Sequence, residues 1–141
     1  MILVTGGAGY IGSHTVRELR SRGADVVVYD NLVTGHIEAV GDAPFVKGDI
    51  FDKDLLVKTF QDYNVDSVVH FAAYSLVGES MTNPAKYYRN NVAGTLSLLD
   101  AMLEAGVKYL VFSSSAATYG DTGDGLITED SPQRPTSVYG Q

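Results

Sequence analysis

The first twelve residues constrain the fold more than any other stretch of the chain. They read Met-Ile-Leu-Val-Thr-Gly-Gly-Ala-Gly-Tyr-Ile-Gly, an apolar run followed by four glycines. Gly7, Gly9 and Gly12 satisfy G-x-G-x-x-G, while Gly6, Gly9 and Gly12 satisfy G-x-x-G-x-x-G. Such glycines allow a tight turn and let the backbone approach a pyrophosphate at a helix N-terminus. This stretch therefore predicts a buried strand, a dinucleotide-binding turn and a helix, with a ligand-free turn as the alternative.

A nucleoside triphosphate loop is a different glycine motif, and the sequence excludes it. That motif requires Gly-Lys-Ser or Gly-Lys-Thr, whereas Gly12 is followed by Ser13 and His14.

The alternation of strand and helix patterns continues along the chain. Further apolar runs at residues 25–29, 44–47, 67–71 and 109–113 predict parallel strands. Helices are expected from the glycine turn to Gly23, after Asp52, and from Pro84 to just before Gly106. The pattern predicts an α/β fold, a doubly wound parallel sheet of the Rossmann type. On the last helix, the stripe expected to pack on the core is Tyr88, Val92, Leu96, Leu99 and Leu103.

Composition narrows the class of ligand. The 141 residues are 45% hydrophobic, which is enough for one domain with a core, and the net charge is −7. An acidic chain lacks the cationic surface that nucleic acid or an anionic membrane requires. There is no cysteine, and the three histidines show no ligand spacing, so no metal site is expected. Without a signal-like N-terminus, the chain is predicted to be cytoplasmic.

The end of the chain shows no regular pattern. Glycines and prolines between residues 120 and 135 predict a loop, and Tyr139-Gly140-Gln141 closes without a cap or a final strand. We therefore expect residues 1–141 to be an NAD-binding domain that is incomplete at its C-terminus and lacks a substrate-binding region. The fifth strand would then present an open edge, which predicts self-association or marginal stability.

Two acidic residues follow predicted strands. Asp30 lies close to the spacing of about 20 residues after the glycine motif at which a carboxylate binds the adenosine ribose. It would repel a 2′-phosphate, which favours NAD over NADP. Asp49 with Ile50 could contact the adenine. The alternatives are a solvated turn aspartate for Asp30 and a helix N-terminal aspartate for Asp49.

Hydroxyl groups gather at the end of the fifth predicted strand. Ser113-Ser114-Ser115 would lie at the carboxyl edge of the sheet, where ligands bind in open α/β folds. Tyr119 or Tyr139 could supply a general acid or base, although a phenol with a reference pKa of about 10 requires a nearby cation. A lysine one helical turn later would serve, but Tyr119 has Gly123 there, and for Tyr139 the position is residue 143. A packed aromatic side chain remains the alternative for both.

These elements together resemble the extended short-chain dehydrogenase/reductase family. Within that family, the run Val77-Gly78-Glu79-Ser80 and the later Asn90-Asn91-Val92-Ala93-Gly94-Thr95 are most similar to the UDP-glucose 4-epimerases, and sugar-nucleotide dehydratases differ there. The motifs that carry the resemblance run in order through the chain: Thr5–Gly12, Tyr29-Asp30-Asn31-Leu32, Gly48-Asp49-Ile50, His70-Phe71-Ala72-Ala73, Ser113-Ser114-Ser115-Ala116 and Tyr139-Gly140.

The resemblance implies an activity and a role for each motif. It implies NAD-dependent interconversion of UDP-glucose and UDP-galactose through a 4-keto sugar, in a homodimer. Tyr139 would take the proton of the sugar 4-hydroxyl, and Ser115 would hydrogen-bond the same oxygen. Ser75 stands where many epimerases have a lysine that touches the cofactor. The cofactor residues implied are Gly6, Gly9, Tyr10, Ile11 and Gly12 for the pyrophosphate, Asp30 and Asn31 for the ribose, Asp49 and Ile50 for the adenine, Phe71, Ala72 and Ala73 along the cofactor, Asn91 towards the nicotinamide, and Ser113.

Two other functions stay open at this point. The chain could bind a nucleotide without turnover, because the lysine partner of Tyr139 lies beyond Gln141. It could also belong to a sugar-nucleotide dehydratase or to another nucleotide-sugar epimerase.

Overall fold

The computed structural model describes residues 1–123 and 125–141. Strands and helices alternate along most of the chain, and the described residues after β5 contain only a short 3₁₀ turn, Ala116–Tyr119. In chain order the elements are β1 (Ile2–Thr5), α1 (Tyr10–Ser21), β2 (Val26–Asp30), a 3₁₀ turn (Ile37–Val40), β3 (Phe45–Lys47), α2 (Lys53–Asp62), β4 (Ser67–His70), α3 (Val77–Thr82), α4 (Pro84–Tyr87), a π-helical segment (Tyr88–Ala93), α5 (Gly94–Ala105) and β5 (Tyr109–Phe112).

The strands form one five-stranded parallel sheet in the order β3-β2-β1-β4-β5. The order reverses next to β1, so chain segments leave the carboxyl ends of β1 and β4 in opposite directions. In the register of the sheet, Thr5 at the end of β1 lies opposite Tyr29 on β2 and His70 on β4. The predicted doubly wound fold is confirmed, and all five predicted strands are present.

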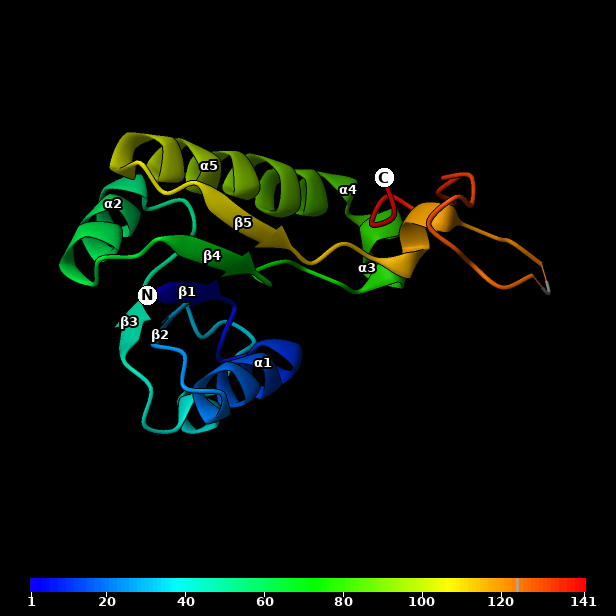
Figure 1. The fold of residues 1–141 in the computed structure, drawn as a ribbon. Helices are drawn as coiled ribbons and strands as arrows, with labels where there is room; N and C mark the ends of the chain where they lie inside the picture. The colour runs from blue at the N-terminus through cyan, green and yellow to red at the C-terminus, as the bar shows by residue number, and fades with distance from the viewer. Residues whose placement is uncertain (124) are drawn as a thin grey trace.

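Helices cover both faces of the sheet (Figure 1). Helix α1 packs on one face, where Val16 contacts a cluster that includes Val4 and Val28. Helices α2 and α5 pack together on the other face. There, Leu56 and Leu98 are fully buried in the larger cluster. Alternate residues of each central strand therefore point into two different cores, as a sheet buried on both faces requires.

Local sequence signals explain where two of the helices begin. The carboxylate of Asp52 accepts a hydrogen bond from the Leu55 amide at 3.0 Å and caps α2. Asn83 caps α4 in the same way, with Pro84 in the first turn.

The long helix expected from residue 84 to 105 is present, but it differs from the prediction in two ways. A π-helical segment, Tyr88–Ala93, interrupts it, and the short helix α3 precedes it. The predicted core stripe was wrong for four of its five members, since Tyr88, Val92, Leu96 and Leu103 are exposed and only Leu99 packs on the core.

The packing of α5 explains this error. The buried residues are Leu98, Ala101 and Met102, which lie on a different face from the predicted stripe. Helix α5 itself carries apolar side chains on nearly all of its faces, so the periodicity of the sequence alone could not identify the face that packs on the sheet.

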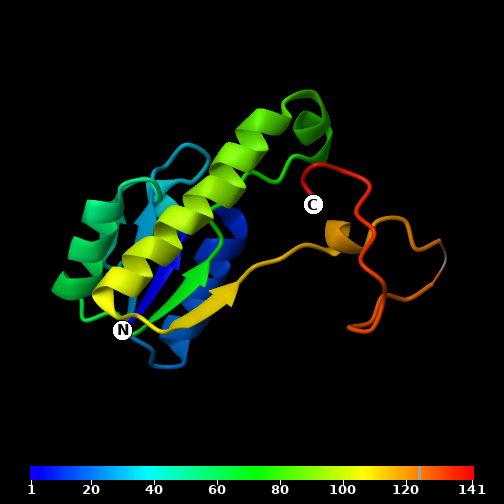
Figure 2. The same cartoon turned by 90° about the horizontal axis from the view of Figure 1, so that it is seen from above.

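The C-terminal segment leaves the sheet after β5. Figure 2 shows its described residues extending away from the sheet and then returning towards α3 and α4. The predicted loop over residues 120–135 is confirmed in its described part, which contains no helix or strand. Among the described residues, no helix is long and apolar enough to cross a membrane.

Candidate functional site

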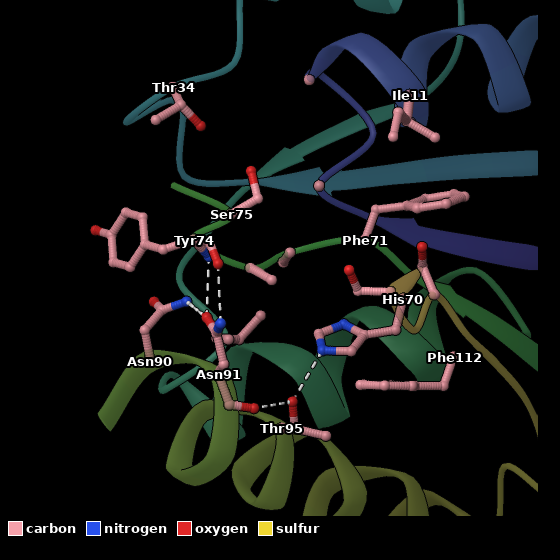
Figure 3. Close-up of a pocket in the computed structure, with 18 of the residues that line it drawn as sticks. Ile11, Thr34, His70, Phe71, Tyr74, Ser75, Asn90, Asn91, Thr95 and Phe112 are labelled. Carbon is pink, nitrogen blue, oxygen red and sulfur yellow. Dashed lines mark hydrogen bonds between the residues drawn. The ribbon is translucent and has the colours of Figure 1, made fainter. Parts of the chain in front are cut away.

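A cavity of about 610 Å³ opens at the carboxyl ends of the central strands. The glycine turn after β1, the segment after β4 and the π-helical segment contribute to its wall (Figure 3). The C-terminal turn also lines it. This position agrees with the rule that ligands of open α/β sheets bind where the strand order reverses. Residues far apart in the sequence thus form one site.

The glycine turn is too tightly packed for side chains at two positions. Gly6 has φ +70°, and a Cβ on Gly12 would lie 2.2 Å from the carbonyl oxygen of Gly6. The turn therefore lies directly against the start of α1. The first amides of a helix have no partner within the helix, and Gly9, Tyr10 and Ile11 line the cavity at this point. The arrangement suits an anion such as a pyrophosphate.

Asp30 joins the glycine turn to the end of β2. Asp30 is 8% exposed, and its carboxylate accepts hydrogen bonds from the amides of Ala8 at 3.0 Å and Leu32 at 2.8 Å. Each carboxylate oxygen keeps a second lone pair, and Asp30 lines the cavity. The carboxylate thus orders the turn and can still accept from a ligand hydroxyl.

Asp49 and Ile50 have different positions relative to the cavity. Ile50 and Asn31 line it, whereas Asp49 does not. The Asp49 carboxylate instead accepts from the Asn31 side chain at 2.9 Å and from the Phe51 amide at 3.1 Å. In this structure Asp49 therefore orients Asn31 and the turn before α2.

Tyr29 supports the same corner from within the core. Its hydroxyl donates to the carbonyl oxygen of Asp49 at 2.9 Å. Burial, followed by the nearby carboxylates of Asp52 and Asp49, raises the pKa of the Tyr29 phenol well above its usual value. The phenol therefore remains a hydrogen-bond donor at neutral pH.

His70 lies at the floor of the cavity between two threonines (Figure 3). Its Nδ1 is 2.6 Å from the hydroxyl of Thr5, and its Nε2 is 3.0 Å from the hydroxyl of Thr95. The Thr95 hydroxyl donates its proton to the carbonyl oxygen of Asn91 at 2.6 Å, so His70 Nε2–H must donate to Thr95. In the neutral ring, Nδ1 carries no proton and accepts from the Thr5 hydroxyl.

Burial lowers the pKa of His70 to about 4. His70 is thus a buried histidine whose two ring nitrogens both have hydrogen-bond partners. The sequence pattern did not identify its partner Thr95, because that residue lies on another element.

Asn91 clamps the segment that follows β4. Its side-chain oxygen accepts from the Tyr74 amide and its side-chain nitrogen donates to the Tyr74 carbonyl, both at 2.9 Å (Figure 3). A side chain that pairs with both backbone groups of one residue fixes the path of Phe71, Ala72 and Ala73, all of which line the cavity. Asn91 itself also lines it.

The two predicted catalytic residues meet at this cavity. Ser115 and Tyr139 both line it, and so does Ser113. Ser115 Oγ accepts from the Ala117 amide at 3.1 Å, which leaves its own proton free to donate. Tyr119, the other tyrosine considered, does not line the cavity.

Several lining residues had no signal in the sequence pattern. They include Thr34 and Tyr74, which lie in loops, and Thr118, which lies in the 3₁₀ turn Ala116–Tyr119. Among the described residues that line the cavity, none is a lysine or an arginine, and Asp30 is the only carboxylate.

A family model described as "NAD dependent epimerase/dehydratase family" matches residues 2–141. The chain belongs to this family. A UDP-glucose 4-epimerase of Lactobacillus helveticus, one of its relatives, is 59% identical over 99% of the chain. The chain spans about 43% of the length of that relative.

Solved structures of the family superpose closely on the chain. The UDP-glucose 4-epimerase of Brucella ovis in complex with NAD is 52% identical, with a TM-score of 0.95 over 99% of this chain and 43% of that one. The dTDP-glucose 4,6-dehydratase DesIV of Streptomyces venezuelae, with NAD and TYD bound, is 39% identical, with a TM-score of 0.89 over 99% of this chain and 47% of that one. Proteins with different reactions thus share this part of the fold.

Proposed function

We propose that the chain is the NAD-binding domain of an enzyme that interconverts UDP-glucose and UDP-galactose. The observation that carries the proposal is that Ser115 and Tyr139 line the same cavity as the glycine turn and Asp30. The similarity to UDP-glucose 4-epimerases supports this reaction over others. Because the chain spans less than half of those relatives, the activity is proposed for the full-length protein.

The residues around the cavity fit NAD. The turn that excludes a Cβ at Gly12 leaves room for close backbone approach, and the start of α1 supplies unpaired amides for the pyrophosphate. Asp30 would accept from the ribose hydroxyls and would repel a 2′-phosphate. Asn31 and Ile50 would bind the adenosine half, Asp49 would act through Asn31, and residues 71–73 with Asn91 and Ser113 would lie along the rest of the cofactor.

The catalytic roles proposed for this chain divide between two hydroxyl groups. Tyr139 as phenolate would take the proton of the sugar 4-hydroxyl, while Ser115 donates a hydrogen bond to the same oxygen. Bound NAD would supply the acceptor for the C4 hydride and the source of its return, so there would be no net redox change. The 4-keto sugar would turn over in the cavity before the hydride returns to its other face.

The experiment supplies the full-length protein with UDP-galactose and measures UDP-glucose. We expect turnover without added NAD, together with NAD released on denaturation. Tyr139→Phe removes the proposed acid–base group, so kcat should fall by roughly 10²–10⁴. Absence of UDP-glucose from the wild-type reaction would disprove the proposed function.

A nucleotide-binding role without turnover is the second candidate, and it applies to the 141-residue chain alone. The described lining residues include no lysine or arginine that could favour the phenolate of a tyrosine. We expect calorimetry to detect NAD binding by this chain and product analysis to detect no epimerisation. Measurable epimerisation would exclude this candidate.

The similarity to DesIV supports a third candidate, a sugar-nucleotide dehydratase or another nucleotide-sugar epimerase. Incubating the full-length protein with several UDP- and dTDP-sugars separates these reactions, since a dehydratase releases water and forms a 4-keto-6-deoxy sugar.

We also propose that the full-length protein is a homodimer, because exposed apolar residues follow one another along the long helix. We further propose that it is located in the cytoplasm. Analytical ultracentrifugation and cell fractionation test these two points.

A further inference from the structure

The C-terminal turn that carries Tyr139 is held by a helix 59 residues earlier in the chain. The backbone amide of Tyr139 donates to Ser80 Oγ in α3 at 3.1 Å. Next to it, the amide of Val138 lies 3.5 Å from Met81 Sδ. Within the turn itself, the Gly140 amide bonds to the backbone oxygen and to Oγ of Ser137. The turn therefore has an internal structure, and its anchor is on α3.

The polarity of the Ser80 hydroxyl is fixed by its second bond. Ser80 Oγ donates its proton to the Val77 carbonyl at 2.6 Å, so its lone pairs face the Tyr139 amide as acceptors. Ser80 is fully buried, and burial strengthens the dependence of each group on its partner. Without the hydroxyl, the Tyr139 amide would lose its acceptor in α3.

Helix α3 is in turn fixed to the wall of the cavity. The Glu79 carboxylate accepts from Lys86 Nζ and from the Tyr87 hydroxyl, both at 2.7 Å. Lys86 Nζ lies 4.4 Å from the ring centre of Tyr74, the residue that Asn91 clamps. The helix that carries Ser80 is thus linked through Glu79 and Lys86 to Tyr74, in the segment that lines the cavity beside the glycine turn.

We infer that Ser80 is a positioning residue for Tyr139: it holds the tyrosine turn against α3 so that the phenol stays in the cavity opposite the cofactor half of the site. The inference rests on the proposed function for its kinetic consequence only. Its structural part, the anchoring of the turn, can be measured whatever reaction the protein catalyses.

The test compares Ser80→Ala with Thr82→Ala in the full-length protein. Thr82 is a matched control, because its hydroxyl makes the same kind of bond within α3, to the Glu79 carbonyl at 3.1 Å, but it is exposed and forms no hydrogen bond with the described residues of the tyrosine turn. Ser80→Cys is a second variant of similar volume whose thiol accepts hydrogen bonds weakly. It separates the loss of the bond from the loss of packing.

Two readouts are taken. In Ser80→Ala and Ser80→Cys, hydrogen exchange of a peptide over residues 136–141 should become at least tenfold faster, while that of residues 1–12 stays unchanged. With UDP-galactose, kcat should fall at least tenfold with KM nearly unchanged. Thr82→Ala should behave as the wild type in both.

Wild-type exchange at residues 136–141 in both Ser80 variants would overturn the inference. So would an equal effect of Thr82→Ala, or wild-type behaviour of Ser80→Cys, since either result would assign the effect to helix stability or packing. If the wild-type protein forms no UDP-glucose, the proposed function fails, and the exchange comparison still decides the role of Ser80.

Discussion

The imidazole of His70 shows how a single buried residue links the sheet to the helix above it. It joins Thr5 of β1 to Thr95 of α5 and is 3% exposed. Because burial holds its pKa at about 4, below the unfolded value of about 6.5, the unfolded chain takes up a proton first as the pH falls. Stability linked to His70 is therefore present above pH 6.5 and is lost towards pH 4.

We predict that the free energy of unfolding falls by about 3 kcal/mol between pH 6.5 and pH 4 through His70. Urea unfolding at several pH values measures this change. In His70→Gln the pH dependence should be much flatter, whereas the exposed control His36→Gln should keep the steep fall. An unchanged slope in His70→Gln would assign the acid sensitivity to other groups.

A second prediction at the residue scale concerns the lack of space around Gly12. A methyl group there would meet the Gly6 carbonyl at 2.2 Å, so Gly12→Ala must move the turn or the start of α1. Overpacking of this kind costs about 1–3 kcal/mol of unfolding free energy. Thermal unfolding measures the cost, and calorimetry should show weaker NAD binding.

The matched control is Gly78→Ala in α3, where an added Cβ meets nothing within 4 Å. Alanine favours a helix over glycine by roughly 1 kcal/mol, so this variant should be neutral or more stable. Equal destabilisation by both substitutions would contradict the packing argument for Gly12.

At the scale of elements, the N-cap of α2 is a local contact whose contribution to the free energy of unfolding can be measured. Asp52→Ala removes the acceptor of the Leu55 amide and should lower the free energy of unfolding by about 1 kcal/mol. Asp52→Asn retains a capping oxygen and should restore most of it. The prediction fails if urea unfolding finds Asp52→Asn as unstable as Asp52→Ala.

Elements with strong local signals could be predicted from the sequence. The five strands, the glycine turn and the cap at Asp52 depend on residues that are neighbours in the chain, and all are present. The segment Val77–Thr82 is too short for a periodic pattern, so α3 had no signal. The π-helical segment at Tyr88–Ala93 has none either, because no side-chain pattern marks i→i+5 backbone bonds. Its contacts with distant residues, such as the hydrogen bonds between Asn91 and Tyr74, are also not visible in the sequence.

The candidate site divides in the same way. Spacing along the chain indicated Asp30, and the end of a strand indicated Ser115, and both line the cavity. The anchor between Ser80 and Tyr139 joins residues on distant segments, so only the folded chain reveals it. Asp49 does not line the cavity, and its carboxylate accepts a hydrogen bond from Asn31, which does; the motif alone does not specify this contact.

At the scale of the whole molecule, the β5 edge of the sheet carries exposed apolar side chains. In the described part of the chain, β5 pairs only with β4, and its residues Tyr109, Val111 and Phe112 are more than half exposed. Unpaired backbone beside exposed apolar side chains favours association with another sheet edge.

We predict that the 141-residue chain self-associates, with a mass by light scattering that rises with concentration. Val111→Lys places a charge on the open edge and should shift the chain towards the monomer. Leu126→Lys adds the same charge at a loop residue that is 96% exposed and away from the sheet, and should leave association unchanged. A monomeric mass at every concentration would contradict the prediction.

The absence of lysine and arginine among the described cavity residues has a consequence for ionic strength. Where backbone amides bind the cofactor phosphates, there is no attraction to a cationic side chain for salt to screen. The chain also carries a net charge of −7, which repels an anion at long range, and salt weakens this repulsion. NAD affinity should therefore stay constant or increase between low and high salt, which calorimetry over a salt series can measure. A steep loss of affinity with salt would instead require a cationic side chain at the phosphates. The backbone amides at the start of α1 would then not be the main phosphate ligands.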